Sequence, residues 1–222
     1  MTLPGRLIVV EGIDGSGSTT QASRLALRLR DAGLSVVQTA EPSPGPIGTM
    51  IRQVLSHRLV VADVDGPRAP DWRTMALLFA ADRADHGDSL LRPALERGSW
   101  VVSDRYFLSS LAYQSLTSPQ GTAALPWLRA INQTAVLPAL TVVLQISAKV
   151  AASRRRLRGG APELFEVSTL QERLADAYGK PAQLVGDGAL AHPIVEVDAH
   201  QSADTVARDL AELVSDATGF LL

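Results

Sequence analysis

The sequence predicts an α/β fold, a five-stranded parallel sheet with helices on both faces. Three observations lead to it. Short runs rich in β-branched residues alternate with longer segments of helical periodicity. A glycine-rich turn joins the first run directly to a helical segment. The chain of 222 residues is long enough for one full core and has the size of one domain, so we expect a single domain over residues 1–222.

The first two expected strands and the helix between them form a βαβ unit at the start of the chain. Helical periodicity over Thr20 to Arg30 places an apolar stripe on one face, and Gly33 closes the helix. The strands are expected at Leu7 to Val10, Ser35 to Thr39, Trp100 to Ser103, Leu140 to Ile146 and Pro193 to Val197.

Two further helices and two loops complete the expected elements. Met75 to Glu96 has helical periodicity, and we expect Pro93 to bend or end this helix. Ser202 to Thr218 has the pattern of a closing amphipathic helix. The segments Pro42 to Pro70 and Gly159 to Pro162 have the least regular patterns. Loops at strand ends are where α/β enzymes carry their chemistry.

Composition and charge exclude several function classes. No apolar run approaches the roughly 20 residues that a membrane helix needs, and a formal net charge of -2 gives no overall attraction to nucleic acid. The first residues do not have the pattern of a signal peptide, so we expect a cytoplasmic protein. Without cysteine there can be no disulfide or thiolate site. The histidines show no metal-ligand spacing, and we expect all of them at the surface: His57, His86, His192 and His200.

The strongest motif is the loop at residues 11–19, Glu-Gly-Ile-Asp-Gly-Ser-Gly-Ser-Thr, which leads into a helix. Glycines in such a loop let backbone N–H groups surround a phosphate, and the hydroxyl that follows binds Mg²⁺. Thr19 stands at the position of that hydroxyl. We therefore expect phosphate contacts from the loop and the first helical turn, at Gly12, Gly15, Ser16, Gly17, Ser18, Thr19 and Thr20.

Ser18 stands where the phosphate-loop pattern has a lysine. That lysine reaches the β- and γ-phosphates as a mobile point charge. The chain has only two lysines, Lys149 and Lys180, and neither is near the loop in the sequence. A plain tight turn is the alternative interpretation of a glycine-rich loop without its lysine. The strand, loop and helix context favours phosphate binding.

Further motifs follow the loop in a fixed order. They are Glu41-Pro42, Leu78-Phe79-Ala80-Ala81-Asp82-Arg83, Asp104-Arg105-Tyr106, Ser109 to Gln114 (Ser-Ser-Leu-Ala-Tyr-Gln) and Val197-Asp198-Ala199. Together with the loop, they resemble the bacterial thymidylate kinases, which are P-loop nucleoside-monophosphate kinases. The resemblance implies transfer of the γ-phosphoryl group of ATP to dTMP, giving dTDP for dTTP biosynthesis, with Mg²⁺ as the cofactor. It also implies a homodimer.

Phe79 and Arg83 lie four residues apart, so they project from the same face of a helix. An aromatic ring can stack on a base while a guanidinium one turn away donates to a ring carbonyl. The resemblance assigns these roles toward thymine to Phe79 and Arg83. Without the flanking motifs, the alternative is a core Phe79 and a surface ion pair of Arg83 with Asp82 or Asp85.

Asp104 and Arg105 end the third expected strand, at the edge where open α/β sheets bind ligands. A carboxylate there can organise Mg²⁺, and an adjacent guanidinium can clamp a phosphate. A surface ion pair is the alternative. The resemblance assigns Arg105 to the dTMP phosphate, Ser110 to the base edge and Tyr113 to the sugar, where its ring excludes a 2′-hydroxyl. It also places Glu41 and Gln114 in the dTMP site.

Asp14, within the loop, is placed to meet the deoxyribose 3′-hydroxyl or a metal-bound water. A turn-forming aspartate is the alternative interpretation.

Residues 153–158 are rich in arginine (Arg154, Arg155, Arg156 and Arg158) and are followed by a glycine pair. Arg154 and Arg158 share a helical face. The resemblance implies a basic lid over about residues 150–164, which closes over ATP. We expect catalytic roles for Arg154 and Arg158, together with Asp14 and Arg105, because cations stabilise the charge that develops in phosphoryl transfer. A solvated basic helix face is the alternative.

Five positions depart from the family pattern: Ser18, Ala40, Ser43-Pro44 and Gln145. They concern phosphate and metal handling more than base recognition. Three hypotheses remain open. The chain is a dTMP kinase in which a lid arginine replaces the lysine charge, a catalytically silent nucleotide-binding or regulatory homologue, or a kinase for another deoxynucleotide or deoxynucleoside.

Overall fold

The fold is built on a five-stranded parallel sheet, in a computed structural model that describes residues 5–159 and 164–222 and, at Arg158, the backbone alone. The strand order is β2-β3-β1-β4-β5, and every neighbouring pair is parallel. The predicted sheet is confirmed. The strands are β1 (Leu7–Gly12), β2 (Val36–Ala40), β3 (Trp100–Asp104), β4 (Leu140–Gln145) and β5 (Ile194–Asp198).

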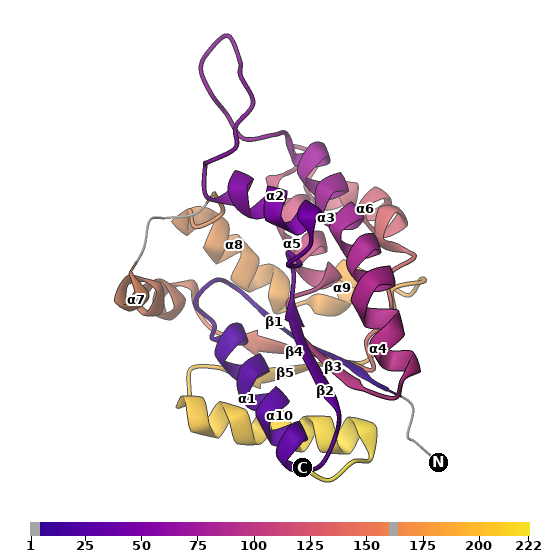
Figure 1. Ribbon diagram of the computed structural model, residues 1–222. Coiled ribbons are helices and arrows are strands. Elements are labelled where there is room, and N and C mark those ends of the chain that lie inside the picture. The colour runs from indigo at the N-terminus through magenta and orange to yellow at the C-terminus, as the bar shows by residue number, and fades with distance from the viewer. Residues whose placement is uncertain (1–4, 160–163) are drawn as a thin grey trace.

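Helices cover both faces of the sheet, as the sequence predicts (Figure 1). On one face, α1 (Ser18–Asp31) packs against α10 (Ala203–Thr218). On the other, α5 (Phe107–Thr117) contacts β1, and α8 (Ser168–Tyr178) contacts β4. Outside this layer lie α2 (Pro46–Leu55), α3 (Trp72–His86), η2 (Gly121–Ala124), α6 (Leu125–Asn132) and α9 (Pro181–Val185).

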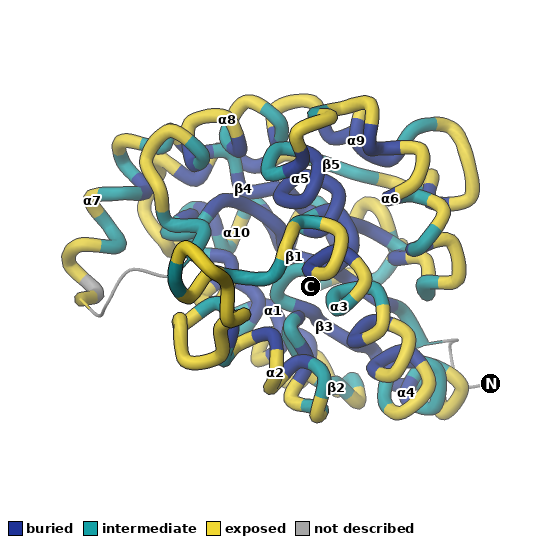
Figure 2. The backbone as a smooth tube through the Cα atoms, turned by 90° about the horizontal axis from the view of Figure 1, so that it is seen from above, coloured by how far each residue is buried: buried dark blue, intermediate teal, exposed yellow. Residues whose placement is uncertain are grey.

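The three central strands are buried on both faces (Figure 2). Their runs of Val, Ile and Leu are therefore continuous rather than alternating, as is usual for parallel strands between two helix layers. Leu7 to Val10 are all buried, and so are Val101 and Val102. This core fixes the carboxyl ends of β1 and β3, where the predicted site residues follow.

The long helical segment over Met75 to Glu96 does not end at Pro93. It runs from α3 through a π-helical segment, η1 (Gly87–Leu91), into α4 (Arg92–Glu96). Pro93 occupies the first turn of α4, where a missing N–H is tolerated. The expectation of a bend or stop at Pro93 is wrong in its position, because the irregularity lies in the π-helical segment that precedes it.

The expectation that Pro42 to Pro70 is irregular is wrong for its first part, which forms α2, and right for its second part. Pro46 begins α2, since its fixed φ suits a first helical turn, and Ile51 and Val54 on this helix are buried. Residues 58–70 do form an irregular excursion, closed by the antiparallel bridge between Val61 and Arg68. This excursion projects from the top of the molecule in Figure 1.

The arginine-rich segment forms α7 (Ala148–Arg158), which Ser147 caps by accepting a hydrogen bond from the N–H of Val150. The expected lid at residues 150–164 includes residues 160–163, which lie outside the described part of the chain. Across residues 5–159 and 164–222, no helix has the length and apolar character needed to cross a membrane.

Candidate active site

The predicted phosphate loop joins β1 to α1, in the strand, loop and helix arrangement that the sequence predicts. Gly15 and Gly17 have φ of 90° and 99°, a left-handed region that favours glycine. The N-terminus of α1 has no side-chain cap and no acidic residue in its first turn. Its free N–H groups and the helix dipole therefore favour an anion.

Thr19 and Asp104 meet beside this loop. The Thr19 hydroxyl donates to Oδ2 of Asp104 at 2.5 Å, while Oδ1 of Asp104 is buried without a partner. A hydroxyl and one carboxylate suit Mg²⁺, which keeps several waters and is completed by substrate phosphates. The described residues contain no cluster of three or more His, Cys, Asp or Glu side chains that could hold a metal by themselves.

A cavity of ≈ 130 Å³ brings together all the residues predicted for the acceptor. Its lining also includes residues that the sequence reasoning did not assign to the site, among them Leu55 from α2 and Phe165, which precedes α8. The predicted residues in the lining are Asp14, Glu41, Phe79, Arg83, Arg105, Ser110, Tyr113 and Gln114.

Arg83 is only 3% exposed, which rules out a surface ion pair with Asp82 or Asp85. Its Nη2 donates to Oε2 of Glu41 at 2.6 Å and to the Ser110 hydroxyl at 2.9 Å, and its Nη1 donates to Oδ1 of Asn132. Nε of Arg83 and Oε1 of Gln114 are buried without partners. The cavity therefore offers an unpaired donor and an unpaired acceptor to a ligand.

His86 corrects the expectation that all four histidines lie at the surface. It is 2% exposed, hydrogen-bonds Thr39 through Nε2 at 2.8 Å, and contacts Oε1 of Glu41 through Nδ1 at 3.3 Å. His86 lies one turn beyond Arg83 on α3, so both side chains reach Glu41. The carboxylate of Glu41 is thus held from two sides.

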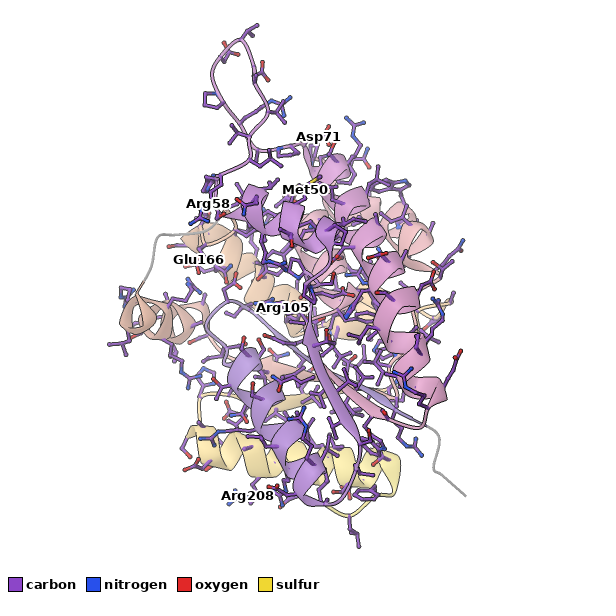
Figure 3. The ribbon with its side chains drawn as sticks, viewed as in Figure 1. Met50, Arg58, Asp71, Arg105, Glu166 and Arg208 are labelled. Carbon is purple, nitrogen blue, oxygen red and sulfur yellow. The ribbon has the colours of Figure 1, made fainter. Side chains whose placement is uncertain are left out.

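Arg105 lines the acceptor cavity, and its backbone has a left-handed conformation, with φ of 69°. Its Nη1 donates to the carbonyl of Gly12 at 2.8 Å, and its Nη2 donates to Oδ1 of Asp14 at 2.6 Å. Burial alone would lower the pKa of Arg105, but Tyr113 and Asp14 raise it well above its ordinary value. The guanidinium therefore stays charged at the centre of the molecule (Figure 3).

Asp14 accepts hydrogen bonds from three separate parts of the chain, so it is more than a turn-forming aspartate. Besides Arg105, the Tyr113 hydroxyl and Nε2 of Gln171 each donate to its Oδ2 at 2.9 Å. Burial raises the pKa of Tyr113, so its hydroxyl remains a donor at neutral pH. Gln171 reaches the loop from α8 and has no signal in the sequence, because its distance along the chain hides the contact.

Glu11 is a second functional residue that sequence reasoning left without a role. It is fully buried and accepts hydrogen bonds from the backbone N–H groups of Tyr106 and Ser109 and from the hydroxyls of Ser109 and Tyr178. Burial raises its pKa, although the hydrogen bonds from Ser109 oppose the shift. Glu11 thereby fixes the start of α5 against the phosphate loop.

A second cavity, of ≈ 500 Å³, lies over the phosphate loop. Of the predicted phosphate contacts, Gly12 and Ser16 do not line it. The two residues lie close together, since a Cβ at Gly12 would meet the Ser16 hydroxyl at 2.6 Å. Asp14 and Arg105 line both cavities. The lining of the second cavity is Asp14, Gly15, Gly17, Ser18, Thr19, Thr20, Arg105, Arg154, Arg155 and Glu166.

Two arginines of α7 contact the phosphate loop. Arg154 donates to the carbonyls of Ser16 at 3.3 Å and Ala199 at 2.9 Å, and Nη1 of Arg155 donates to the carbonyl of Asp14. The side chain of Arg158, which was predicted to be catalytic, lies outside the described residues. The structure thus brings Arg154 to the site and adds Arg155.

Two departures from the family pattern have defined partners. The backbone N–H and the hydroxyl of Ser43 donate to the buried carboxylate of Asp82 at 2.7 and 2.5 Å, which holds the turn after Glu41. Gln145 donates to the carbonyl of Tyr178 at 2.6 Å and so ties the end of β4 to α8. Both residues support the walls of the site.

The sequence model of the thymidylate kinase family matches residues 10–208. The chain is 37% identical to the probable thymidylate kinase of Pyrococcus horikoshii, over 95% of this chain and 96% of that protein. It is 35% identical to the thymidylate kinase of Thiobacillus denitrificans, over 98% of this chain and 100% of that protein. With the phosphate loop, the acceptor cavity and the fold in agreement, this chain belongs to the thymidylate kinase family.

Proposed function

We propose that this protein transfers the γ-phosphoryl group of ATP to dTMP, giving ADP and dTDP. The single observation that carries the proposal is that Asp14 and Arg105 line both cavities. A donor over the phosphate loop and an acceptor in the polar cavity would then meet at these two side chains. Direct transfer between two bound nucleotides needs such a meeting point, because the reacting oxygens must be brought into line.

The donor side is suited to the phosphates of ATP. Free N–H groups at the start of α1 would bind the phosphates, and Thr19 and Asp104 would hold Mg²⁺. The metal would supply charge neutralisation as the phosphoryl group leaves ADP. Within this scheme Arg154 holds the lid helix against the loop, through its hydrogen bonds to Ser16 and Ala199.

The acceptor side is suited to a thymine nucleotide. Phe79 would stack on the base, while the unpaired Nε of Arg83 and Oε1 of Gln114 would hydrogen-bond its edge. Ser110 and Glu41 orient Arg83 by accepting its Nη2 hydrogen bonds. Tyr113, held by Asp14, would contact the sugar and exclude a 2′-hydroxyl. Arg105 would bind the phosphate through its planar donors.

We further propose that one domain, residues 1–222, carries this activity in the cytoplasm, and that the protein acts as a homodimer. Support for the dimer comes from partly exposed apolar side chains on adjoining helices, Met50 on α2, Leu77 on α3 and Trp127 on α6. Exposed apolar groups on adjoining elements are typical of subunit interfaces. Sedimentation of the wild type and of Leu77→Glu would test it, and a monomeric wild type would contradict the dimer.

A coupled assay for ADP release tests the function, with Mg²⁺, ATP and each nucleoside monophosphate in turn. We expect turnover with dTMP well above that with dCMP, dGMP, dAMP and the ribose counterpart of dTMP. Because Ser18 replaces the loop lysine, a silent nucleotide-binding protein is the second candidate. Calorimetric binding of dTMP without turnover would support that candidate, and preferred turnover of another nucleotide would reassign the substrate.

A further inference from the structure

The substitution at Ser18 leaves the donor site without its usual cation. Ser18 is the first residue of α1, is 6% exposed and borders the donor cavity. Neither lysine lines this cavity. Lys149 is exposed in the first turn of α7, and Lys180 borders a separate groove with Thr122 and Gln183. Among the described residues of the lining, the cations are Arg105, Arg154 and Arg155.

Two of these three arginines donate from both terminal nitrogens to oxygens of the protein. Arg105 is held by Asp14 and the carbonyl of Gly12, where it also lines the acceptor cavity. Arg154 divides its two terminal nitrogens between the carbonyls of Ser16 and Ala199. In the described part of the chain, Arg155 donates from Nη1 alone, and its acceptor is the carbonyl of Asp14 in the phosphate loop.

The side chain of Arg155 lies across Gly15, the central glycine of the loop. A Cβ at Gly15 would lie 3.0 Å from Cγ of Arg155 and 2.4 Å from the carbonyl oxygen of Ala151, one turn earlier on α7. The same side chain donates from Nη1 to the carbonyl of Asp14. Packing against a glycine and a hydrogen bond to the loop backbone therefore hold the Arg155 guanidinium beside the donor cavity.

We propose that Arg155 supplies the positive charge that Ser18 does not, from a fixed position on the phosphate loop. This inference rests on the proposed function. It differs from an arginine that enters the site only when a lid closes, because Arg155 is already docked. A guanidinium remains charged at any working pH, and a docked cation needs no reorganisation when charge develops on the transferring phosphoryl group. Ser18 and Arg155 line the same cavity.

A mutant cycle tests the exchange of charge between the two positions. The proteins are wild type, Arg155→Gln, Ser18→Lys, the double variant Ser18→Lys/Arg155→Gln, and Lys149→Gln as a control that removes one exposed charge from the same helix. We expect Arg155→Gln to lower kcat by about 100-fold, the typical loss when one transition-state donor is removed. Binding of dTMP should not change. Lys149→Gln should match the wild type.

The double variant distinguishes loss of the positive charge from loss of the hydrogen bond that Arg155 donates to the loop. A lysine at position 18 can supply the missing charge but cannot restore the hydrogen bond from Arg155 to the Asp14 carbonyl. We therefore expect the double variant to recover about tenfold or more of the lost kcat, since a loop lysine supplies the same stabilisation. An equal loss from Arg155→Gln in both backgrounds would show a structural role and overturn the inference, as would full activity of Arg155→Gln.

Calorimetry with Mg²⁺ and a non-hydrolysable ATP analogue provides a second reading that does not need turnover. Arg155→Gln should weaken binding of the analogue by about tenfold, as expected for loss of one charged contact, and Ser18→Lys should restore it. If the wild type binds the analogue but does not phosphorylate dTMP, the proposed function fails. The binding measurements on these variants then still test whether Arg155 contacts the phosphates. Equal binding by all five proteins would overturn the role of Arg155.

Discussion

The acceptor and donor halves of the site are built in different ways. In the acceptor half, side chains from separate elements hold one another, as Glu41, Arg83 and His86 do with Ser110 and Asn132. In the donor half, the proposed ligands are backbone N–H groups, one hydroxyl, one carboxylate and arginines on a neighbouring helix. Acceptor recognition therefore depends on each side chain, whereas charge in the donor half can come from more than one position.

This comparison gives a physical reason why the phosphate loop can have Ser18 in place of a lysine. A lysine can be lost from the phosphate loop if another cation lies close to the same phosphates, because charge acts over distance and has little directional requirement. A buried network of hydrogen bonds has no such freedom, since one missing partner leaves a buried polar group unpaired. Changes in the acceptor half should therefore affect folding as well as binding.

The largest effect is expected from Arg83→Leu. Removal of one partner leaves the carboxylate of Glu41 buried without its main counter-ion, so the free energy of unfolding should fall by about 3–5 kcal/mol. Urea unfolding measures it. The matched control is Arg73→Leu on the same helix, whose ion pair with Asp71 is exposed and should contribute at most about 1 kcal/mol. Similar losses from both variants would contradict a preformed acceptor network.

Asp104→Asn should impair catalysis through the donor half and leave dTMP binding in the acceptor half unchanged. The amide cannot pair with Mg²⁺ as the carboxylate does, so kcat should fall by about 100-fold, equivalent to about 2.7 kcal/mol of transition-state stabilisation. The dTMP dissociation constant should stay the same, and the Mg²⁺ concentration for half-maximal rate should rise. Unchanged Mg²⁺ dependence would show that Asp104 does not contact the metal site.

Tyr113→Ala tests whether a single side chain of the acceptor half sets the selectivity for the sugar. Loss of the ring makes room for a 2′-hydroxyl, so the preference for dTMP over its ribose counterpart should narrow by about tenfold, or 1.4 kcal/mol. The ratio of kcat/KM for the two nucleotides measures it. Tyr113→Phe is the control, since it keeps the ring and removes only the hydroxyl that donates to Asp14. Equal narrowing in both variants would assign selectivity to the hydroxyl instead.

The smallest effect concerns Glu11, which lies between the two halves. Burial raises its pKa from the ordinary 4.5, so the folded state holds the proton more tightly than the unfolded chain does. Its contribution to stability is then largest below pH 4.5 and is lost as pH rises from there through the raised pKa. The free energy of unfolding of the wild type minus that of Glu11→Gln should fall as pH rises over that range. A difference independent of pH would contradict the raised pKa.

Much of the site could be predicted because its residues follow local rules. Glycines after a strand, Phe79 and Arg83 four residues apart, and Asp104 and Arg105 at a strand end all place side chains through short-range geometry. Phe79, Arg83 and Arg105 line the acceptor cavity, Gly15, Gly17 and Arg105 line the donor cavity, and Asp104 hydrogen-bonds Thr19, which borders the donor cavity. Their chemical roles remain proposals that the variants above test.

Other residues could not be predicted because their contacts join distant parts of the chain. His86 follows a motif on a helix, and the sequence predicts a surface residue, but His86 is buried and contacts Glu41 and Thr39. Gln171 reaches Asp14 from α8 across much of the sequence. No local pattern marks either contact, because neither helical periodicity nor a strand end specifies which distant element packs against it.

The sequence by itself determined the parallel sheet, the phosphate loop and the family, since each depends on the order and spacing of residues along the chain. Only the tertiary structure decided that Arg155 lies across Gly15, that Arg83 is buried against Glu41, and that Asp14 and Arg105 border both cavities. The physical reason is packing: burial and pairing of charge depend on which elements come together in three dimensions.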